Sequence, residues 1–243
     1  MRPVEKKKPD EAIKCLTSLG ETKTVVIQHE YDPYRDAVEP LSANIGLFCS
    51  YCEEPRAIGD LAVEHISPKG EGGARCSWDN FLLACSICNS GKGHTKCNAT
   101  DTHFPHLDNT FLDFIYDETG RVKVNPGLPD EMKRKAENLF NLVKLGRHPG
   151  CEDKPTARDY RWHHRFETWE VASRKLDQYN NGIINIDDIV ELAHLYGNWS
   201  VWFTVFKGKD EVRKALIEKT PGTCENCFDP ENHYEPVPRN VRQ

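Results

Sequence analysis

The second half of the chain carries apolar residues at the three- and four-residue spacing of amphipathic helices. The segment 129–146 has Pro129 at its start and Gly146 at its end. These residue types are typical start and stop signals of a helix. Asn185 is a predicted N-cap. The pattern predicts helices in residues 129–146, 156–182, 185–197, 199–208 and 210–219. Residues 198–206 contain two tryptophans and two phenylalanines. We expect these aromatic side chains to be buried, either in a core of this region or against a partner protein.

The first half of the chain has a different pattern. Residues 111–126 alternate apolar and polar positions around a glycine-containing turn, which predicts a β-hairpin. Residues 36–48 predict a short helix, and residues 60–66 predict a strand. We therefore expect an α+β chain that is mainly helical. Its expected parts are an N-terminal segment (1–46), a cysteine module (47–110) and a hairpin with a helical region (111–243).

Composition and charge narrow the classes of protein. Of 243 residues, 38% are hydrophobic and 29% are charged, and no apolar run approaches the roughly 20 residues of a membrane span. No apolar segment follows the basic start, so a secretory signal is not expected and the default location is cytoplasmic. The net charge of −6 argues against a broadly basic surface. A nucleic-acid substrate would need a local positive field or one supplied by a partner.

Cysteine spacing gives the strongest chemical signal. Cys49 and Cys52 form one Cys-x2-Cys pair, and Cys85 and Cys88 form another. Two such pairs complete a tetrahedral zinc site with four sulfur ligands and no open position, so the ion would be structural. The alternative is four ordinary buried cysteines. The matched spacing within one short segment favours Zn²⁺.

A third pair, Cys224 and Cys227, has no fourth ligand pair to complete a site. Two ligands alone bind a metal weakly, so we favour a role without metal. The alternative is a metal site completed by Cys151, His233 or a partner chain.

Three further features lie within the cysteine module. Glu64 and His65 stand between the two cysteine pairs, Asn80 precedes the second pair, and Asn89 directly follows Cys88. With these residues, the stretch from Cys49 to Lys92 resembles the HNH endonuclease family in its zinc-stapled ββα-metal form. Asn89 replaces the histidine of the usual third position, and Glu64 replaces a more common aspartate.

The resemblance implies phosphodiester hydrolysis with divided roles. A neutral His65 would deprotonate water. Glu64 and Asn89 would offer oxygen ligands to a catalytic Mg²⁺ or Mn²⁺, and Asn80 would tether the loop backbone. Since neighbours in a strand point to opposite faces, Glu64 and His65 can share a cleft only at a bend or a strand end.

Basic side chains make this module locally positive. Lys69, Arg75, Lys92 and Lys96 are candidates for contacts with nucleic-acid phosphates. A solvated basic face without that role is the alternative for any one of them. DNA is the expected substrate, with RNA as the alternative.

Details of the motifs favour a narrower resemblance. "YCE" at the first cysteine pair, "EHISPK" and "WDNFLLACSICNSGKG" are similar to the nuclease subunits of Septu anti-phage systems, the PtuB subfamily. This resemblance implies a defence effector that works with an ATPase subunit of the PtuA type, docked on the helical region. Two alternatives stay open: a free-standing HNH restriction or mobile-element endonuclease, and a zinc-stapled nucleic-acid-binding module without catalysis.

Overall fold

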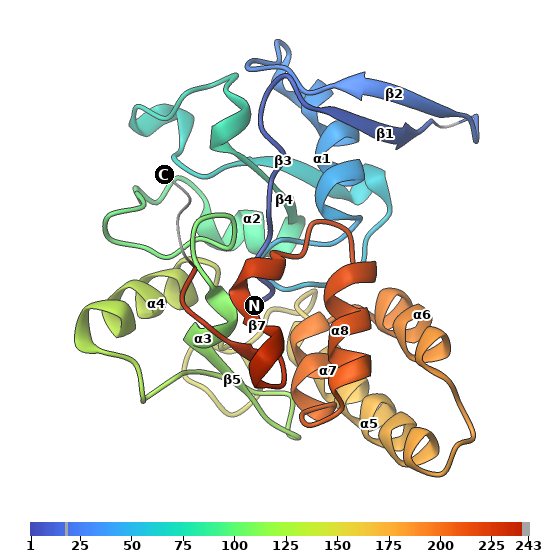
Figure 1. Cartoon of the computed structure of the whole chain (residues 1–243). Helices are drawn as coiled ribbons and strands as arrows, with labels where there is room; N and C mark the ends of the chain where they lie inside the picture. The colour runs from blue at the N-terminus through green and yellow to red at the C-terminus, as the bar shows by residue number, and fades with distance from the viewer. Residues whose placement is uncertain (18, 240–243) are drawn as a thin grey trace.

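A two-stranded hairpin and a short helix stand at the centre of the molecule, between a projecting hairpin and a group of helices. The computed structural model describes residues 1–17 and 19–239. In Figure 1 the β1–β2 hairpin projects at one end, β3 and β4 lie in the middle, and α5 to α8 gather towards the opposite end. The expected class, α+β and mainly helical, is confirmed.

Strands pair only as hairpins within the described part of the chain. The pairs are all antiparallel: β1 (Ala12–Leu16) with β2 (Thr22–Val26), β3 (Leu61–His65) with β4 (Phe81–Cys85), β5 (Phe114–Tyr116) with β6 (Val122–Val124), and β7 (Phe228–Asp229) with β8 (Glu235–Pro236). The strand expected in residues 60–66 and the hairpin expected in residues 111–126 are therefore confirmed. The register of β3 places His65 opposite Phe81.

The predicted helices are present, and all but the one at 210–219 have shifted ends. The helices are α1 (Val38–Ile45), α2 (Ser86–Lys92), α3 (Thr110–Asp113), α4 (Asp130–Leu142), α5 (Arg161–Asn180), α6 (Ile186–Tyr196), α7 (Trp199–Val205) and α8 (Asp210–Lys219). Asn185 caps α6 as expected: its side chain accepts the Asp188 N–H, and the Asp188 carboxylate accepts the Asn185 N–H.

Helix α4 ends four residues before Gly146, the expected stop. Lys144 adopts a left-handed conformation with φ 54°, and the Leu145 N–H donates to the Phe140 carbonyl, which turns the chain away from the helix axis. Gly146 is required for packing, since a Cβ there would lie 2.2 Å from the Phe140 ring.

The N-terminal segment contains a hairpin that the sequence pattern did not reveal. Strands β1 and β2 precede the expected helix α1, and Ile13 and Cys15 point inward from β1 while their neighbours are exposed. The hairpin was missed because only two of its ten strand positions are buried, which leaves a weak apolar alternation.

Buried apolar residues form two clusters. The first surrounds α1, β3 and β4 and includes Leu41, Trp78 and Phe81. The second lies among α5 to α8 and includes Trp202 and Phe203. The aromatic residues of 198–206 are therefore buried in the core of the helical region, one of the two expected settings. No helix of the described residues is both long and apolar enough to cross a bilayer.

A buried carboxylate joins the cysteine module to the helical region. Glu53 is 4% exposed, and its oxygens accept hydrogen bonds from the Ser200 N–H at 3.0 Å, the Ser200 hydroxyl at 2.6 Å and the Arg2 N–H. The first residues of the chain thus meet α7 at the first cysteine pair.

Candidate functional site

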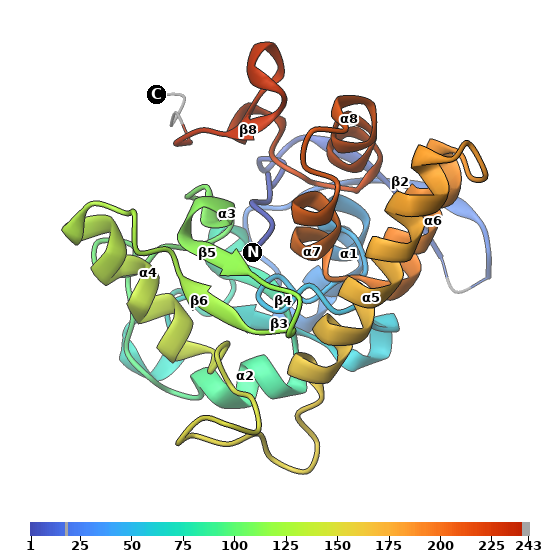
Figure 2. The same ribbon diagram turned by 90° about the horizontal axis from the view of Figure 1, so that it is seen from below.

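The central unit of the cysteine module is a hairpin followed at once by a helix. Strand β4 ends at Cys85, and α2 begins at the next residue, so Cys85 is also the N-cap of α2. Its sulfur accepts the Cys88 N–H at 3.5 Å. Figure 2 shows α2 lying next to the β3–β4 hairpin, a β-β-α arrangement.

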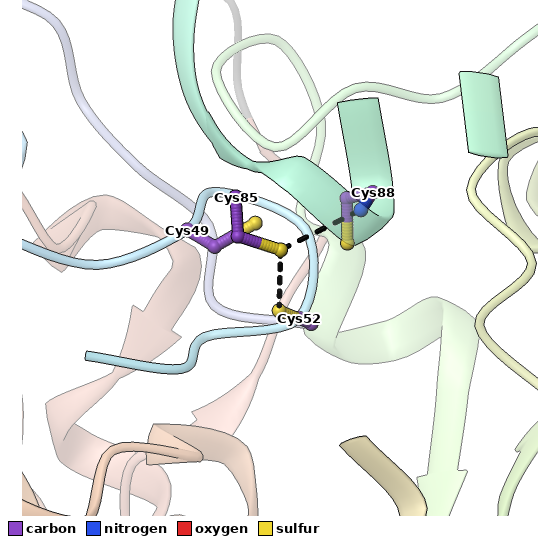
Figure 3. Close-up of side chains that lie close together, drawn as sticks. All are labelled: Cys49, Cys52, Cys85 and Cys88. Carbon is purple, nitrogen blue, oxygen red and sulfur yellow. Dashed lines mark hydrogen bonds between the residues drawn. The ribbon is translucent and has the colours of Figure 1, made fainter. Parts of the chain in front are cut away.

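The four cysteines predicted to bind zinc converge on one point. The sulfurs of Cys49, Cys52, Cys85 and Cys88 all lie within 4.8 Å of one another, and all four residues are buried. Figure 3 shows the side chains arriving from the first loop, the end of β4 and the first turn of α2. The Cys52 and Cys85 sulfurs are 3.7 Å apart, close to the edge of about 3.8 Å of a tetrahedron with Zn–S bonds of about 2.3 Å. The donor set fits a zinc ion.

Neighbouring thiols favour a thiolate at Cys85, whereas burial raises the pKa of Cys52 and the hydrogen bond with Cys49 raises that of Cys88. Hydrogen bonds from Cys49, Cys52 and Cys88 hold the pKa of Cys85 far below its usual range. Arg161, at the start of α5, donates to the Cys88 sulfur at 3.3 Å and to the Val143 carbonyl at 2.9 Å. A guanidinium against a thiolate stabilises the negative charge of a four-sulfur site.

Cys224 and Cys227 do not belong to a comparable group among the described residues. Both are buried, and a hydrogen bond from Cys227 lowers the pKa of Cys224 to about 7. The expectation of a role without metal stays a prediction.

His65 stands at the end of β3, in a fixed orientation. Strand β3 ends at this residue, and a strand end is where the neighbouring side chains of Glu64 and His65 can face the same cleft. The imidazole is 8% exposed and lies between the rings of Tyr34, with centroids 4.8 Å apart, and Phe81, at 5.1 Å. Its Nε2 lies 2.8 Å from the Arg75 carbonyl oxygen, which can only accept, so Nε2 carries the proton and Nδ1 keeps its lone pair. Burial lowers the pKa of His65, which keeps the ring neutral at pH 7.

Asn80 holds the loop that carries this carbonyl. Its side-chain oxygen accepts the Ser67 N–H at 2.8 Å, and its amide donates to the Ser67 carbonyl at 3.0 Å and the Ala74 carbonyl at 2.8 Å. These are the hydrogen bonds expected of a loop tether. Because Ala74 precedes Arg75, the tether also fixes the acceptor of the His65 hydrogen bond.

Glu64 occupies a buried polar pocket and not an open position. Its Oε1 lies 2.6 Å from the Lys92 ammonium, and its Oε2 accepts the Tyr51 hydroxyl at 2.6 Å. Glu64 and Lys92 are each 2% exposed, and burial raises the pKa of Tyr51 well above its usual value, so the phenol keeps the proton that it donates. With both oxygens engaged, Glu64 as arranged does not fit a metal ion. Its assignment as a metal ligand stays a prediction.

The other candidate residues divide into exposed and buried ones. Asn89 is exposed on α2, in contrast to Cys88 and Lys92, which are buried. Lys69, Arg75 and Lys96 are exposed, as a phosphate contact requires. The structure corrects the expected position of Lys92: the ammonium points inward to Glu64 and to the His65 carbonyl at 2.7 Å, and not towards solvent.

Three residues of this site were not singled out from the sequence. Tyr51 hydrogen bonds to Glu64, Tyr34 packs on His65, and Arg161 donates to a zinc-site sulfur. Only Tyr51 had a signal, since it lies inside the first cysteine pair. Tyr34 and Arg161 reach the site through tertiary packing, which no local pattern encodes.

Residues 49–95 match the family model described as HNH endonuclease. The matched segment contains both cysteine pairs, Glu64, His65, Asn80 and Asn89. No curated protein matches the chain. The cysteine module therefore carries an HNH endonuclease domain that has a four-cysteine cluster able to hold a metal ion.

Proposed function

We propose that this protein is an HNH endonuclease that hydrolyses phosphodiester bonds of DNA, with His65 as the general base. The observation that carries the proposal is the fixed imidazole at the end of β3, within the segment that matches the family. Hydrolysis at neutral pH needs a base that is unprotonated before it accepts the proton of water. The lowered pKa of His65 and its lone pair on Nδ1 meet that need.

The surroundings of His65 support this role. The Arg75 carbonyl fixes the tautomer and stabilises the ring after Nδ1 takes a proton, while the Asn80 tether holds that carbonyl in place. Exposed Lys69 and Arg75 both follow His65 in the chain, and their positive charges can meet a phosphate near the imidazole, to which the Arg75 backbone is hydrogen bonded. Lys69 itself lies over the Tyr34 ring, 4.3 Å from the centroid, on the ring that packs against His65.

Cleavage assays on plasmid DNA and on RNA, each with Mg²⁺, Mn²⁺ or a chelator, test the proposal. We expect His65→Ala to lower the cleavage rate by at least about 100-fold. His94→Ala is the matched control, because His94 is an exposed histidine of the same module, and it should keep the wild-type rate. Unchanged cleavage by His65→Ala would remove His65 as the base. The nucleic acid that is cut decides between DNA and RNA, and a fully folded, zinc-containing protein that cuts neither favours the non-catalytic binding module.

We further propose that the nuclease acts as a defence effector with an ATPase subunit of the PtuA type. The support is the resemblance of the cysteine-module motifs to the Septu nuclease subfamily. Helix α6 offers a docking surface, since Leu195 is 70% exposed and Tyr196 is 41% exposed at its end.

Co-purification with a co-expressed PtuA-type ATPase tests the partnership. We expect a complex with the wild type, and loss of that complex with Leu195→Asp, while zinc content stays the same. Lys214→Asp on α8 is the control for a charge change elsewhere on the helical region. Absence of any complex, together with cleavage by the isolated protein, would instead favour the free-standing endonuclease.

A further inference from the structure

We propose that Tyr34 is a positioning residue of the nuclease site, whose ring holds the His65 imidazole in its reactive orientation and seats the Lys69 ammonium beside it. The inference rests on the proposed nuclease function, in which His65 is the general base. It deepens that function by assigning a role to a residue outside the segment that matches the HNH family.

The orientation of the His65 imidazole depends on three neighbours. The hydrogen bond from Nε2 to the Arg75 carbonyl holds one ring atom, but a single hydrogen bond leaves the ring free to turn about it. The rings of Phe81 and Tyr34 stand nearly perpendicular to the imidazole, at 83° and 72°. The three centroids form a triangle with sides of 4.8, 5.1 and 6.5 Å, so the two rings make a corner around the imidazole. Edge-to-face contacts of this kind favour one mutual orientation of the rings.

The Tyr34 ring contacts a cation as well. The Lys69 ammonium lies 4.3 Å from the ring centroid, within the range of a cation–π interaction. Lys69 is otherwise an exposed residue of the loop after β3, so the tyrosine restricts where its charge can lie. Because one ring contacts both side chains, the base and the cation are held close together. Phosphodiester hydrolysis needs this arrangement, with water activated beside a phosphate whose charge is neutralised.

Backbone contacts place Tyr34 at the site. It is the first residue of a short 3₁₀ helix, Tyr34–Ala37. Three residues earlier, the Tyr31 N–H donates to the Cys76 carbonyl at 2.8 Å. Cys76 directly follows Arg75, whose carbonyl accepts the hydrogen bond from the proposed base. The same loop therefore positions the imidazole through its own carbonyl and through the segment that carries the tyrosine.

Steady-state cleavage of DNA by Tyr34 variants tests the proposal. We expect Tyr34→Ala to lower kcat at least about tenfold, because the base is no longer aligned with the attacked phosphate. It should also raise KM at least about fivefold, because Lys69 loses its seat. The increase in KM should disappear in the Lys69→Met background, where the seat has no occupant.

Two further variants separate the ring from other effects. Tyr34→Phe keeps the aromatic ring and should bring kcat and KM back to within about twofold of the wild type. Tyr160→Ala, at a tyrosine of the helical region that is 58% exposed, should keep the wild-type values. If Tyr34→Ala does not fold, Tyr34→Leu takes its place, since leucine keeps an apolar contact without a ring. Wild-type kcat in the variant without a ring, or equal losses in that variant and in Tyr34→Phe, overturns the proposal.

A modification assay without substrate separates this inference from the nuclease function. Diethyl pyrocarbonate acylates unprotonated imidazoles, and mass spectrometry gives the rate at each histidine. We expect His65 to react at least about fivefold faster in Tyr34→Ala than in the wild type, because one side of its ring opens to water. Exposed His94 and buried His103 should keep their wild-type rates, the latter showing that the fold is intact.

The assay has an outcome that overturns the inference. A His65 rate that Tyr34→Ala does not change would show that the tyrosine does not hold the imidazole. A protein that cuts no nucleic acid, and in which His65 nevertheless reacts faster in Tyr34→Ala, would overturn the nuclease function and support the contact between the two rings.

Discussion

Histidines in this protein differ in charge because their neighbours differ. His103 hydrogen bonds to the buried Asp113 carboxylate, at 3.0 Å, and this contact raises its pKa against the effect of burial. His106 has no hydrogen-bond partner for Nδ1 among the described residues, and burial, with Lys6 and Arg239 nearby, lowers its pKa to about 3. The pKa of the same residue type is therefore raised at one position and lowered at the other.

The depressed pKa of His106 predicts acid sensitivity. Between about pH 6.5 and pH 3 the unfolded chain binds this proton and the folded chain does not, so the free energy of unfolding falls as pH falls through that range. At pH 5.0 the loss is roughly 2 kcal/mol. Urea unfolding at pH 7.5 and 5.0 measures it. We expect His106→Gln to reduce the difference between the two pH values by about that amount, whereas exposed His94→Gln should not; an unchanged difference would contradict the assignment.

At the residue scale, the sequence predicted the identity of the residues around the site better than the orientation of their side chains. The convergence of the four cysteines was expected from their spacing, and Asn80 makes hydrogen bonds to Ser67 and Ala74, while the roles of these residues stay predictions. Lys92 was expected at the surface because a lysine at the end of a glycine-flanked helix is usually solvated. Its burial depends on how α2 lies against β3, and local sequence does not determine that packing.

Helix α2 is the element on which the site depends most. One end is capped by the sulfur of Cys85, which is also a predicted zinc ligand, and the other end carries Lys92. Seven residues are too few for a stable isolated helix, so α2 depends on its packing against β3 and β4, and a metal ion at the cysteine cluster would stabilise it further.

Loss of one sulfur should therefore release the metal and loosen α2. We expect Cys52→Ser to reduce the zinc content from about one ion per chain towards zero and to lower the melting temperature, because a four-sulfur site supplies folding energy. Elemental analysis and thermal unfolding measure both effects. Cys151→Ser, outside the cluster, should keep its zinc. Full zinc content in Cys52→Ser would show that the cluster is not the zinc site.

The N-cap of α6 is predicted to stabilise the helical region. Asn185→Ala removes the acceptor of the Asp188 N–H and should lower the free energy of unfolding by about 1 kcal/mol. Asn185→Ser, which can still cap, should lose clearly less. Equal losses in the two variants, measured by urea denaturation, would contradict a capping role.

At the element scale, prediction succeeded where the periodic spacing of apolar residues was accompanied by residues that start or stop a helix or a turn. Helix α6, with its cap at Asn185, began where it was expected, and the hairpin of β5 and β6 followed from its alternation. The β1–β2 hairpin was missed because most of its side chains face solvent, and α4 ended early because Lys144 took a conformation that usually belongs to glycine or asparagine.

At the scale of the whole molecule, contacts between distant residues join the nuclease module to the helices. Glu53 and Ser200 are separated by 147 residues, yet two hydrogen bonds connect them in a buried setting. His164 on α5 similarly pairs with Glu54 at 2.7 Å, which raises the pKa of that imidazole. Sequence patterns could not predict these pairs, because partner choice depends on how the elements pack.

Removal of the Glu53 carboxylate should weaken the whole fold. We expect Glu53→Ala to lower the free energy of unfolding by about 3 kcal/mol, since the Ser200 and Arg2 donors would be left buried without an acceptor. Glu71→Ala, at an exposed glutamate of the same module, should change it by less than about 0.5 kcal/mol. Urea denaturation followed by circular dichroism gives both values; similar losses in the two variants would mean that the buried contact contributes little.

The contact from Arg161 to the Cys88 sulfur has a thermodynamic consequence. The guanidinium belongs to the first residue of a twenty-residue helix, and the sulfur belongs to the metal cluster. If tilting of that helix strengthens or weakens the contact, it must alter zinc affinity, and zinc release must by reciprocity alter how readily the helix tilts. A ligand or protein that binds far along α5 would then change the zinc affinity of the thiolates without contacting them.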